Sequence, residues 1–399
     1  MAGPPPLNEQ MDAIRRGAVE IIPEDALARK IERAIGTGEP LIVKQGFDPT
    51  RPDLHFGHMV SVRKLRTFQE LGHKVVFLIG DFTGLVGDPS GVSETRPRLT
   101  EAEVSQNAAT YREQIFRILD PKRTVIERNS RWLGELRMAE LLELTSHYTV
   151  ARMLERDDFA ARWKAHTPIS LLEFLYPLFQ GYDSVALKAD VELGGTDQKF
   201  NLLIGRTLME RYGLEPQVCL IMPLLRGLDG ERKMSKSYDN YVGITDSAED
   251  MYGKTMSIPD TLLEEWTTLL SSATTTELPQ ALESCRSRPY DAKRRLAADL
   301  VTQYQGADAA ARAATHFDTL FKSKGAPAAR PAFRHAPAKL PQVLKDIGFA
   351  RSVSEARRMV TQGGVQLDGA KAGDPDQTIA PGSYLLKYGK LKFADLTIA

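Results

Sequence analysis

A continuous apolar run from Val75 to Ile79 is the feature that most restricts the fold of this 399-residue chain. Such a run, partly β-branched, is typical of a strand buried on both faces of a parallel sheet. A shorter apolar run, Leu41–Val43, and a helical pattern from His58 to Leu71 precede it. A glycine loop follows it through Gly80, Gly84, Gly87 and Gly91. Strand, helix, strand and glycine loop predict a βαβ unit of a doubly wound, Rossmann-like α/β sheet.

The remaining patterns divide the chain into further parts. We predict a Rossmann-like domain over residues 1–245 with a helical insertion, an α-helical domain over 246–321, a proline- and alanine-rich linker over 322–339, and a small α+β module over 340–399. Within these parts we expect helices at 24–36, 137–156, 170–188, 343–347 and 354–362, a loop at 46–50, and strands at 218–222, 365–367 and 384–388.

Composition excludes several classes of protein. With 42% apolar and 26% charged residues the chain is ordinary for a globular protein, and no segment resembles a membrane span or an N-terminal leader, so we expect a cytoplasmic protein without a membrane partner. Two cysteines, Cys219 and Cys285, are too few for a disulfide framework or a cysteine zinc site.

Charge is unevenly distributed along the chain. Residues 322–399 carry 13 Lys/Arg and 6 Asp/Glu, a net charge of +7, which leaves residues 1–321 with 39 and 46, a net charge of −7. A basic tail behind an acidic body fits a polyanion partner, and it also fits a solvated basic module without one.

His55-Phe56-Gly57-His58 lies where the first strand and its loop should turn into a helix. A helix N-terminus favours phosphate, both histidines can donate to phosphate oxygens, and Gly57 lets a base or sugar approach the backbone. Thr50 can add a hydroxyl. Two alternatives are a histidine packed in the core and a metal ligand pair, although no further ligand lies at metal spacing.

Lys233-Met234-Ser235-Lys236-Ser237 follows the apolar run at 218–222. A loop with two lysines and interleaved serines can wrap a triphosphate and offset the charge of departing pyrophosphate. Taken alone it also fits a solvated basic loop. Together with the histidine motif, in this order, it predicts a nucleotide held between two phosphate-binding segments.

Tyr176, Gln180 and Asp183 share one face of a helix that is apolar nearly all round. A buried Asp beside a Tyr and a Gln is costly unless it binds a ligand or belongs to a satisfied polar network. Pro177 should kink this helix or mark its first turn.

Further carboxylates lie in or near loops. Gly194 to Gln198 is a glycine-assisted loop in which Asp197 and Gln198 can bind a ribose or an amino group, Asp88 follows Gly87, and Asp48 follows the first strand. Acidic groups without metal-ligand spacing fit recognition of an ammonium and of hydroxyls, so we expect no metal held by the protein.

These motifs together resemble a class I aminoacyl-tRNA synthetase, specifically the bacterial type of tyrosyl-tRNA synthetase. The resemblance is carried by Gly46–Thr50, His55–His58, Gly87–Gly91, Tyr176–Asp183, Gly194–Gln198 and Lys233–Ser237. The tail, around Ser352–Arg358 and Gly363–Val365, resembles an RNA-binding module shared with a ribosomal small-subunit protein.

The resemblance implies a tyrosine–tRNA ligase that uses ATP with Mg²⁺, acts on tRNA(Tyr) and forms a homodimer. Catalytic roles fall to Thr50, His55, His58, Lys233 and Lys236. Contacts to ATP fall to Asp48, Gly57, Gly195, Asp197, Met234, Ser235 and Ser237. Tyrosine is bound by Asp88, Tyr176, Gln180 and Gln198, with Asp183 accepting from the phenol, and RNA by Arg351, Arg357 and Arg358.

Two positions depart from the family pattern. Lys44 stands where many members have a tyrosine that pairs with the substrate hydroxyl, and Val92 stands where relatives often have a lysine, leaving Arg96 as a candidate pyrophosphate contact. Three alternatives stay open: a tryptophanyl-tRNA synthetase, a catalytically silent RNA-binding protein on a synthetase scaffold, and a nucleotide-binding module unrelated to tRNA.

Overall fold

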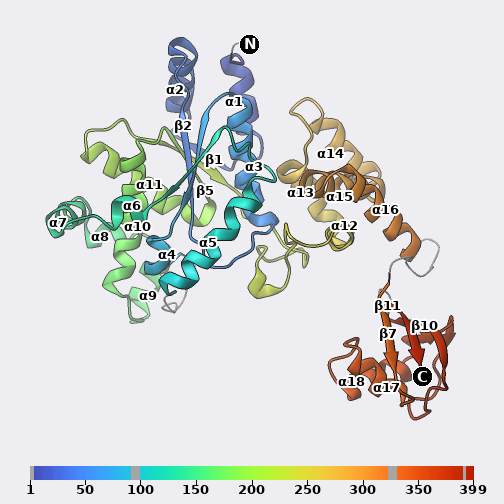
Figure 1. The fold of residues 1–399 in the computed structure, drawn as a ribbon. Coiled ribbons are helices and arrows are strands. Elements are labelled where there is room, and N and C mark those ends of the chain that lie inside the picture. Colours follow the sequence, from blue (N-terminus) through green and yellow to red (C-terminus); the bar gives the residue numbers. More distant parts are fainter. Residues whose placement is uncertain (1–3, 91–98, 322–329, 390–391) are drawn as a thin grey trace. The chain divides into compact units, whose positions relative to one another are not determined.

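A computed structural model of the chain describes residues 4–90, 99–321, 330–389 and 392–399 (Figure 1). The chain forms two compact units, residues 1–311 and 312–399, and each unit is described by itself. Val92 and Arg96 lie outside the described residues.

The first unit is built on a six-stranded sheet with the order β1-β6-β5-β2-β3-β4. β1 pairs antiparallel at one edge, and the other strands run parallel. The predicted run at Val75–Ile79 is fully buried, which confirms the doubly wound α/β class. The strands are β1 (Glu20–Ile22), β2 (Ile42–Phe47), β3 (Lys74–Ile79), β4 (Thr124–Arg128), β5 (Val191–Gly195) and β6 (Val218–Met222).

The winding direction reverses between β2 and β5. From β2 the chain passes through α3 (Phe56–Glu70) to β3, whereas from β5 it passes through α11 (Lys199–Arg211) to β6 on the other side of β2. Figure 1 shows α3 on one side of the sheet and α11 on the other. Such a reversal opens a crevice at the carboxyl ends of the two central strands, where ligands bind in folds of this kind.

Helices cover this sheet and extend from it. Those of the first unit, besides α3 and α11, are α1 (Leu7–Arg15), α2 (Glu24–Thr37), α4 (Thr83–Val86), α5 (Glu101–Ile115), α6 (Ser130–Leu133), α7 (Met138–Ser146), α8 (Val150–Met153), α9 (Asp157–Lys164), α10 (Leu171–Leu187), α12 (Ala248–Ser257), α13 (Leu263–Leu270), α14 (Leu278–Ser287), α15 (Pro289–Gln305) and the start of α16 (Ala307–Phe321), with 3₁₀ helices η1 (Thr196–Gln198), η2 (Lys236–Tyr238) and η3 (Asp260–Leu262).

Three local expectations were wrong. Gly46 and Phe47 lie in β2 and not in the predicted loop, because they continue the parallel pairing with β3. The helix after the histidine motif begins at Phe56 and not at His58, since His55 caps it. The predicted helix over 137–156 is two helices, α7 and α8, because Thr149 starts a new turn by accepting from Arg152 N at 3.3 Å.

Pro177 lies within α10, beyond its first turn. The helix begins six residues earlier, at Leu171, after a capping box in which Ser170 and Glu173 satisfy each other's backbone N–H groups. This cap fixes the start of the helix whose inner face carries Tyr176, Gln180 and Asp183.

The helices after residue 246 pack against the histidine motif through Phe56. The ring of Phe56, the first residue of α3, meets Trp266 at 5.9 Å and Tyr304 at 5.4 Å between centroids. Up to residue 311, these helices belong to the same compact unit as the sheet. The predicted domain boundary at residue 245 therefore stays a prediction.

The second unit has its own sheet and core. Its sheet has the order β7-β11-β10-β8-β9, and its core includes Leu344, Val360, Leu386 and Leu396. Within the predicted linker, β7 pairs in parallel with β11. Its elements are β7 (Ala332–His335), α17 (Leu340–Asp346), α18 (Val353–Thr361), β8 (Val365–Leu367), β9 (Ala370–Lys371), β10 (Gly382–Tyr388) and β11 (Lys392–Ile398).

Candidate active site

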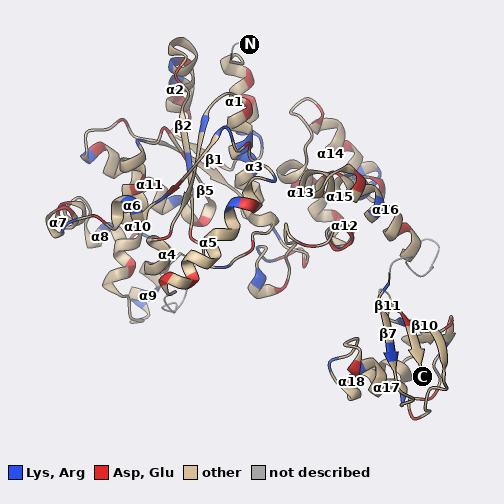
Figure 2. Cartoon of the chain, viewed as in Figure 1, with Lys and Arg blue, Asp and Glu red and all other residues tan. Residues whose placement is uncertain are grey.

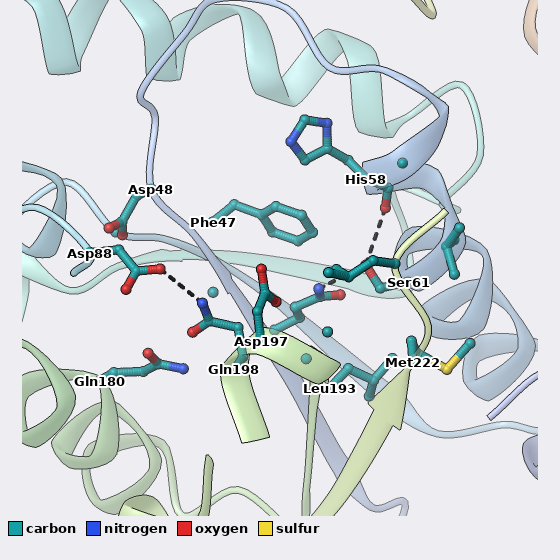
Figure 3. A pocket seen from close by; sticks show the side chains of 18 of the residues that line it. Phe47, Asp48, His58, Ser61, Asp88, Gln180, Leu193, Asp197, Gln198 and Met222 are labelled. Atoms are coloured by element: carbon teal, nitrogen blue, oxygen red, sulfur yellow. Dashed lines mark hydrogen bonds between the residues drawn. The ribbon is translucent and has the colours of Figure 1, made fainter. Parts of the chain in front are cut away.

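A cavity of about 370 Å³ opens at the carboxyl ends of β2 and β5 (Figure 3). Most of the predicted site residues line it, although they come from segments that are far apart in sequence. These residues are Asp48, Thr50, His55, Gly57, His58, Asp88, Tyr176, Gln180, Asp183, Gly195, Asp197, Gln198, Lys233, Met234 and Ser235. Lys236 and Ser237 do not line the cavity and lie next to it in η2.

The two histidines contact each other at the N-terminus of α3, with ring centroids 4.0 Å apart and the rings tilted by 39°. His55 Nδ1 accepts from Gly57 N at 3.1 Å, and His58 Nδ1 accepts from His55 N at 3.1 Å. Burial, the neighbouring ring and Lys236 lower the pKa of His55, and burial with Lys236 lowers that of His58 to about 4. Each neutral ring that accepts at Nδ1 carries its proton on Nε2, so both offer an N–H donor.

Gly57 is required by the motif itself. A Cβ at this position would lie 2.9 Å from His55 Cε1, so a side chain would displace the capping ring. The glycine predicted to admit a substrate therefore also lets His55 fold back over its own helix.

Asn240 holds the lysine-containing loop in shape. Its side chain is buried and accepts from Ser235 N at 2.8 Å while donating to Lys233 O at 3.2 Å and Asp229 Oδ2 at 2.9 Å. Backbone pairing of Met234 N with Leu225 O at 2.7 Å ties the loop to the segment after β6. Sequence reasoning missed Asn240, since no local pattern marks a loop amide as a structural contact.

The two lysines of this loop have acidic partners. Lys233 Nζ lies 3.6 Å from Asp197 Oδ2, and Lys236 Nζ lies 3.0 Å from Asp53 Oδ2. Burial raises the pKa of Asp197, and Lys233 opposes this rise. Both lysines therefore lie beside the cavity, each paired with a carboxylate. A phosphate group of a ligand can replace that carboxylate as the partner of the lysine.

A half-buried carboxylate, Asp48, lies at the end of the cavity opposite the two lysines. It accepts from Tyr176 Oη at 2.9 Å and from Thr83 Oγ1 at 2.7 Å. Burial raises its pKa to about 7; the bond from Thr83 opposes this, and the nearby charge of Asp88 adds to it. Gly80 leaves room for this carboxylate, because a Cβ there would overlap with Asp48 Oδ1.

Asp183 lies at the same end with both oxygens held. Trp132 Nε1 donates to Oδ1 at 2.7 Å and Asn129 Nδ2 to Oδ2 at 3.2 Å. Burial raises the pKa of this carboxyl to about 7, against the opposing effects of Lys44 and of the two donors. Because Asn129 also donates to Thr83 Oγ1 at 2.9 Å, a chain of hydrogen bonds links Asp183 to Asp48.

A third polar group lies beside these acids. Gln198 Nε2 donates to Asp88 Oδ2 at 2.8 Å, as Figure 3 shows. Buried Asn201 donates to Gln180 Oε1 and to Gln198 Oε1, each at 3.1 Å. Asn201 thus orients the two predicted glutamines, and sequence reasoning missed it, as it missed Asn129 and Trp132.

Lys44 does not line the cavity. Its ammonium is buried behind the wall, 2.9 Å from Glu192 Oε1. The position that departs from the family pattern is therefore occupied by half of a buried ion pair.

In the second unit, the predicted RNA-contacting arginines are exposed on or beside α18. Arg357 donates to both oxygens of Asp376, at 2.6 and 2.9 Å, and Lys339 Nζ lies 3.0 Å from the same carboxylate. These bonds, that of Arg357 first, lower the pKa of Asp376 to about 2. Figure 2 shows acidic positions among the basic ones in this unit, and the bonds to Asp376 pair part of the net positive charge.

The described residues contain neither a cluster of metal ligands nor a membrane-spanning helix. Across residues 4–90, 99–321, 330–389 and 392–399, no group of three or more His, Cys, Asp or Glu side chains is placed to hold a metal ion. In the same residues, no helix is long and apolar enough to cross a membrane.

Known proteins resemble the chain over almost its whole length. Residues 37–322 match the family described as tRNA synthetases class I (W and Y), and residues 339–383 match the S4 domain. The chain is 52% identical to a tyrosine–tRNA ligase of Nitratidesulfovibrio vulgaris, covering 98% of this chain and 99% of the relative. It is 52% identical to one of Moorella thermoacetica, covering 97% and 95%.

Solved structures share the fold. A tyrosyl-tRNA synthetase of Archaeoglobus fulgidus, solved with L-tyrosine, has a TM-score of 0.62 at 24% identity and covers 77% of this chain and 100% of its own. A mitochondrial enzyme of Coccidioides posadasii has a TM-score of 0.65 at 24% identity, covering 77% and 91%. The family model spans tryptophan and tyrosine enzymes, whereas the close relatives are tyrosine enzymes.

Proposed function

The chain belongs to the class I tyrosyl-tRNA synthetases, and we propose that its cavity binds tyrosine at the end walled by Asp183 and ATP at the end walled by the two signature motifs. The protein is a tyrosine–tRNA ligase: it activates L-tyrosine with ATP and transfers it to the 3′ end of tRNA(Tyr). The observation that supports the division best is the contrast between the two ends, one with buried carboxylates and the other with histidines and a lysine.

Tyrosine is oriented by the polar groups at the acidic end. Asp183 accepts from the phenol with lone pairs that Trp132 and Asn129 leave open, since a carboxylate offers about four acceptor sites. Asp88 and Gln180 receive the ammonium. The sequence assigned Asp48 to ATP. Its hydrogen bond from Tyr176 at 2.9 Å supports assigning it to the ammonium of tyrosine instead.

ATP occupies the opposite end. The Nε2–H groups of His55 and His58 and the side chain of Thr50 meet the phosphates from one side, and Lys233 meets them from the other. Asp197 and Gly195 face the ribose, and Gln198 faces the carboxylate of tyrosine. Mg²⁺ arrives bound to the phosphates of ATP, because Mg²⁺ keeps substrate phosphates and water as ligands and rarely needs a protein cage.

The chemistry then needs position and charge and no covalent enzyme intermediate. A carboxylate oxygen of tyrosine attacks the α-phosphorus, and the bond to the bridging oxygen of pyrophosphate breaks. Neutral histidines donate hydrogen bonds to the developing charge without having to lose a proton, and Lys233 offsets the charge on pyrophosphate.

Assembly and transfer involve the rest of the chain. Large apolar side chains are exposed between residues 138 and 171, a segment that includes α7, α8 and α9; they are Met138, Leu142, Val150, Trp163 and Leu171. A soluble monomer rarely exposes so many large apolar groups in one segment, which supports a two-fold symmetric homodimer formed through this segment.

The S4-type module adds contacts to tRNA(Tyr) through Arg351, Arg357 and Arg358, and the protein works in the cytoplasm.

The proposal is tested by ATP–pyrophosphate exchange with each of the twenty amino acids. Tyrosine alone should drive rapid exchange. Exchange with tryptophan in its place would favour the related synthetase, and no exchange with any amino acid would favour an RNA-binding protein that has lost catalysis.

A further inference from the structure

A buried ion pair joins the two central strands directly behind the acidic end of the cavity. Lys44 on β2 and Glu192 on β5 face each other in register, with Nζ and Oε1 2.9 Å apart. Their side chains are 1% and 2% exposed, and neither lines the cavity. Since a buried ion pair contributes little stability over an apolar pair of similar size, its presence calls for another role.

The polar contacts of this pair converge on the helix that carries Asp183. Lys44 Nζ donates to the backbone oxygen of Gln180 at 3.4 Å. Glu192 Oε2 accepts from Ser184 Oγ at 3.2 Å and also from Gln217 Nε2. Gln180 and Ser184 lie on α10 on either side of Asp183. The ion pair of Lys44 and Glu192 therefore hydrogen-bonds to this helix at the point where Asp183 lines the cavity.

We propose that Lys44 is a positioning residue for tyrosine specificity, which, anchored by Glu192, holds the segment of α10 that carries Asp183 and places a positive charge behind the carboxylate that accepts from the substrate phenol. This inference rests on the proposed role of Asp183. Lys44, the position that departs from the family pattern, then acts on specificity through Asp183 and not by contact with the substrate.

The charges around Asp183 support this role. Burial raises the pKa of Asp183, and Lys44 is the largest influence opposing that rise, whereas Glu192 adds to it. Among the groups named here, only Lys44 is a cation. The groups facing Asp183 are Lys44 from β2, Glu192 from β5, Asp48 from the end of β2, Tyr176 from α10, and the neutral donors Asn129 and Trp132.

Ionisation of Asp183 matters because it makes phenylalanine costly to bind. When phenylalanine binds, the anion loses water and gains no donor beyond Trp132 and Asn129, whereas a protonated acid has a much smaller penalty. The phenol of tyrosine satisfies the anion. Discrimination between the two amino acids should therefore fall when Asp183 becomes protonated.

The test is a double variant, Lys44→Met with Glu192→Gln, which removes both charges and keeps the volumes and the amide acceptor for Ser184 and Gln217. ATP–pyrophosphate exchange gives kcat/KM for tyrosine and phenylalanine from pH 6 to 9. The ratio of the two constants isolates Asp183, because the ammonium contacts are common to both substrates. Because Lys44 lowers the pKa of Asp183 by more than Glu192 raises it, we expect the pH at which this ratio falls to move upward, with recovery at high pH.

Two single variants complete the design. Glu192→Gln alone keeps Lys44 and removes a carboxylate, so the midpoint should move downward; this variant decides the matter even if the double variant folds poorly. An unchanged profile in both would show that Lys44 only neutralises Glu192. If Asp183→Asn also left the ratio unchanged, the assignment of Asp183 would fail instead.

Discussion

Lowering the pH from 8 to 6 should weaken tyrosine binding, because the ammonium of tyrosine needs Asp48 in its ionised form. Burial raises the pKa of the Asp48 carboxyl to about 7. Its ionised fraction then falls from about nine-tenths at pH 8 to about one-tenth at pH 6, which corresponds to about tenfold in affinity, or about 1.4 kcal/mol. The sign follows from linkage: a ligand that binds the ionised form releases a proton and binds better as the pH rises.

Other groups of the site can be separated from this effect. His58 has a pKa lowered to about 4 and His55 one lowered still further, so both stay neutral throughout this range. Asp183 also has a pKa of about 7 and adds to the slope where its ionisation favours the phenol. The analogue 3-(4-hydroxyphenyl)propionate keeps the phenol and lacks the ammonium, so it reports Asp183 without Asp48.

The assay is isothermal titration calorimetry at several pH values in buffers of different ionisation enthalpy. Tyrosine should release more protons near pH 7 than the analogue does, and Asp48→Asn should remove the difference. Equal slopes for tyrosine and the analogue, or a dissociation constant that stays flat from pH 6 to 8, would refute the role of Asp48 as a partner of the ammonium.

Three further outcomes follow from the same site. His55→Ala and Lys233→Ala should each slow adenylation by roughly a hundredfold, the typical loss for one charge-stabilising donor, with little change in the tyrosine dissociation constant; a change mainly in tyrosine binding would contradict the assignment. Truncation before Leu340 should keep pyrophosphate exchange, lose most tRNA charging and abolish its salt dependence, whereas full charging would show that the module is dispensable. Light scattering should give a dimer mass, and Leu142→Asp should give a monomer; a monomeric parent at micromolar concentration would exclude the dimer.

The sequence predicted the parts of the site that belong to local motifs. Asp183 lies on a helix with a polar face, whereas His55, His58 and Lys233 follow strands whose carboxyl ends meet at one edge of the sheet. Their convergence around one cavity follows from a correctly predicted βαβ unit. The strands at Thr124–Arg128 and Val191–Gly195 were missed, because each contains a charged residue and lacks a continuous apolar run.

The residues that orient the site were not predictable in the same way. Asn129 reaches Asp183 across 54 positions of sequence, and Lys44 reaches Glu192 across the central strand pair. Such contacts depend on strand order and register, which local periodicity does not specify. The sequence could mark Lys44 as unusual for its position, but only the fold shows that it turns away from the cavity toward Glu192.

The central claim is that Asp183 reads the hydroxyl of tyrosine, and the ratio of kcat/KM for tyrosine to that for phenylalanine in Asp183→Asn tests it most directly. Tyrosine enzymes are themselves the standard example of rejection of the analogue without a hydroxyl, by about 10⁵, which is a known property of the family and not a result of this structure. Replacing the anion by an amide removes a charge-assisted hydrogen bond to the phenol of about 1.5–3 kcal/mol, and it also removes the penalty of burying a carboxylate that gains no donor from phenylalanine. We predict that the ratio falls by at least one to two orders of magnitude, through both slower tyrosine and faster phenylalanine activation. A ratio equal to that of the parent enzyme at pH 8 would contradict the account.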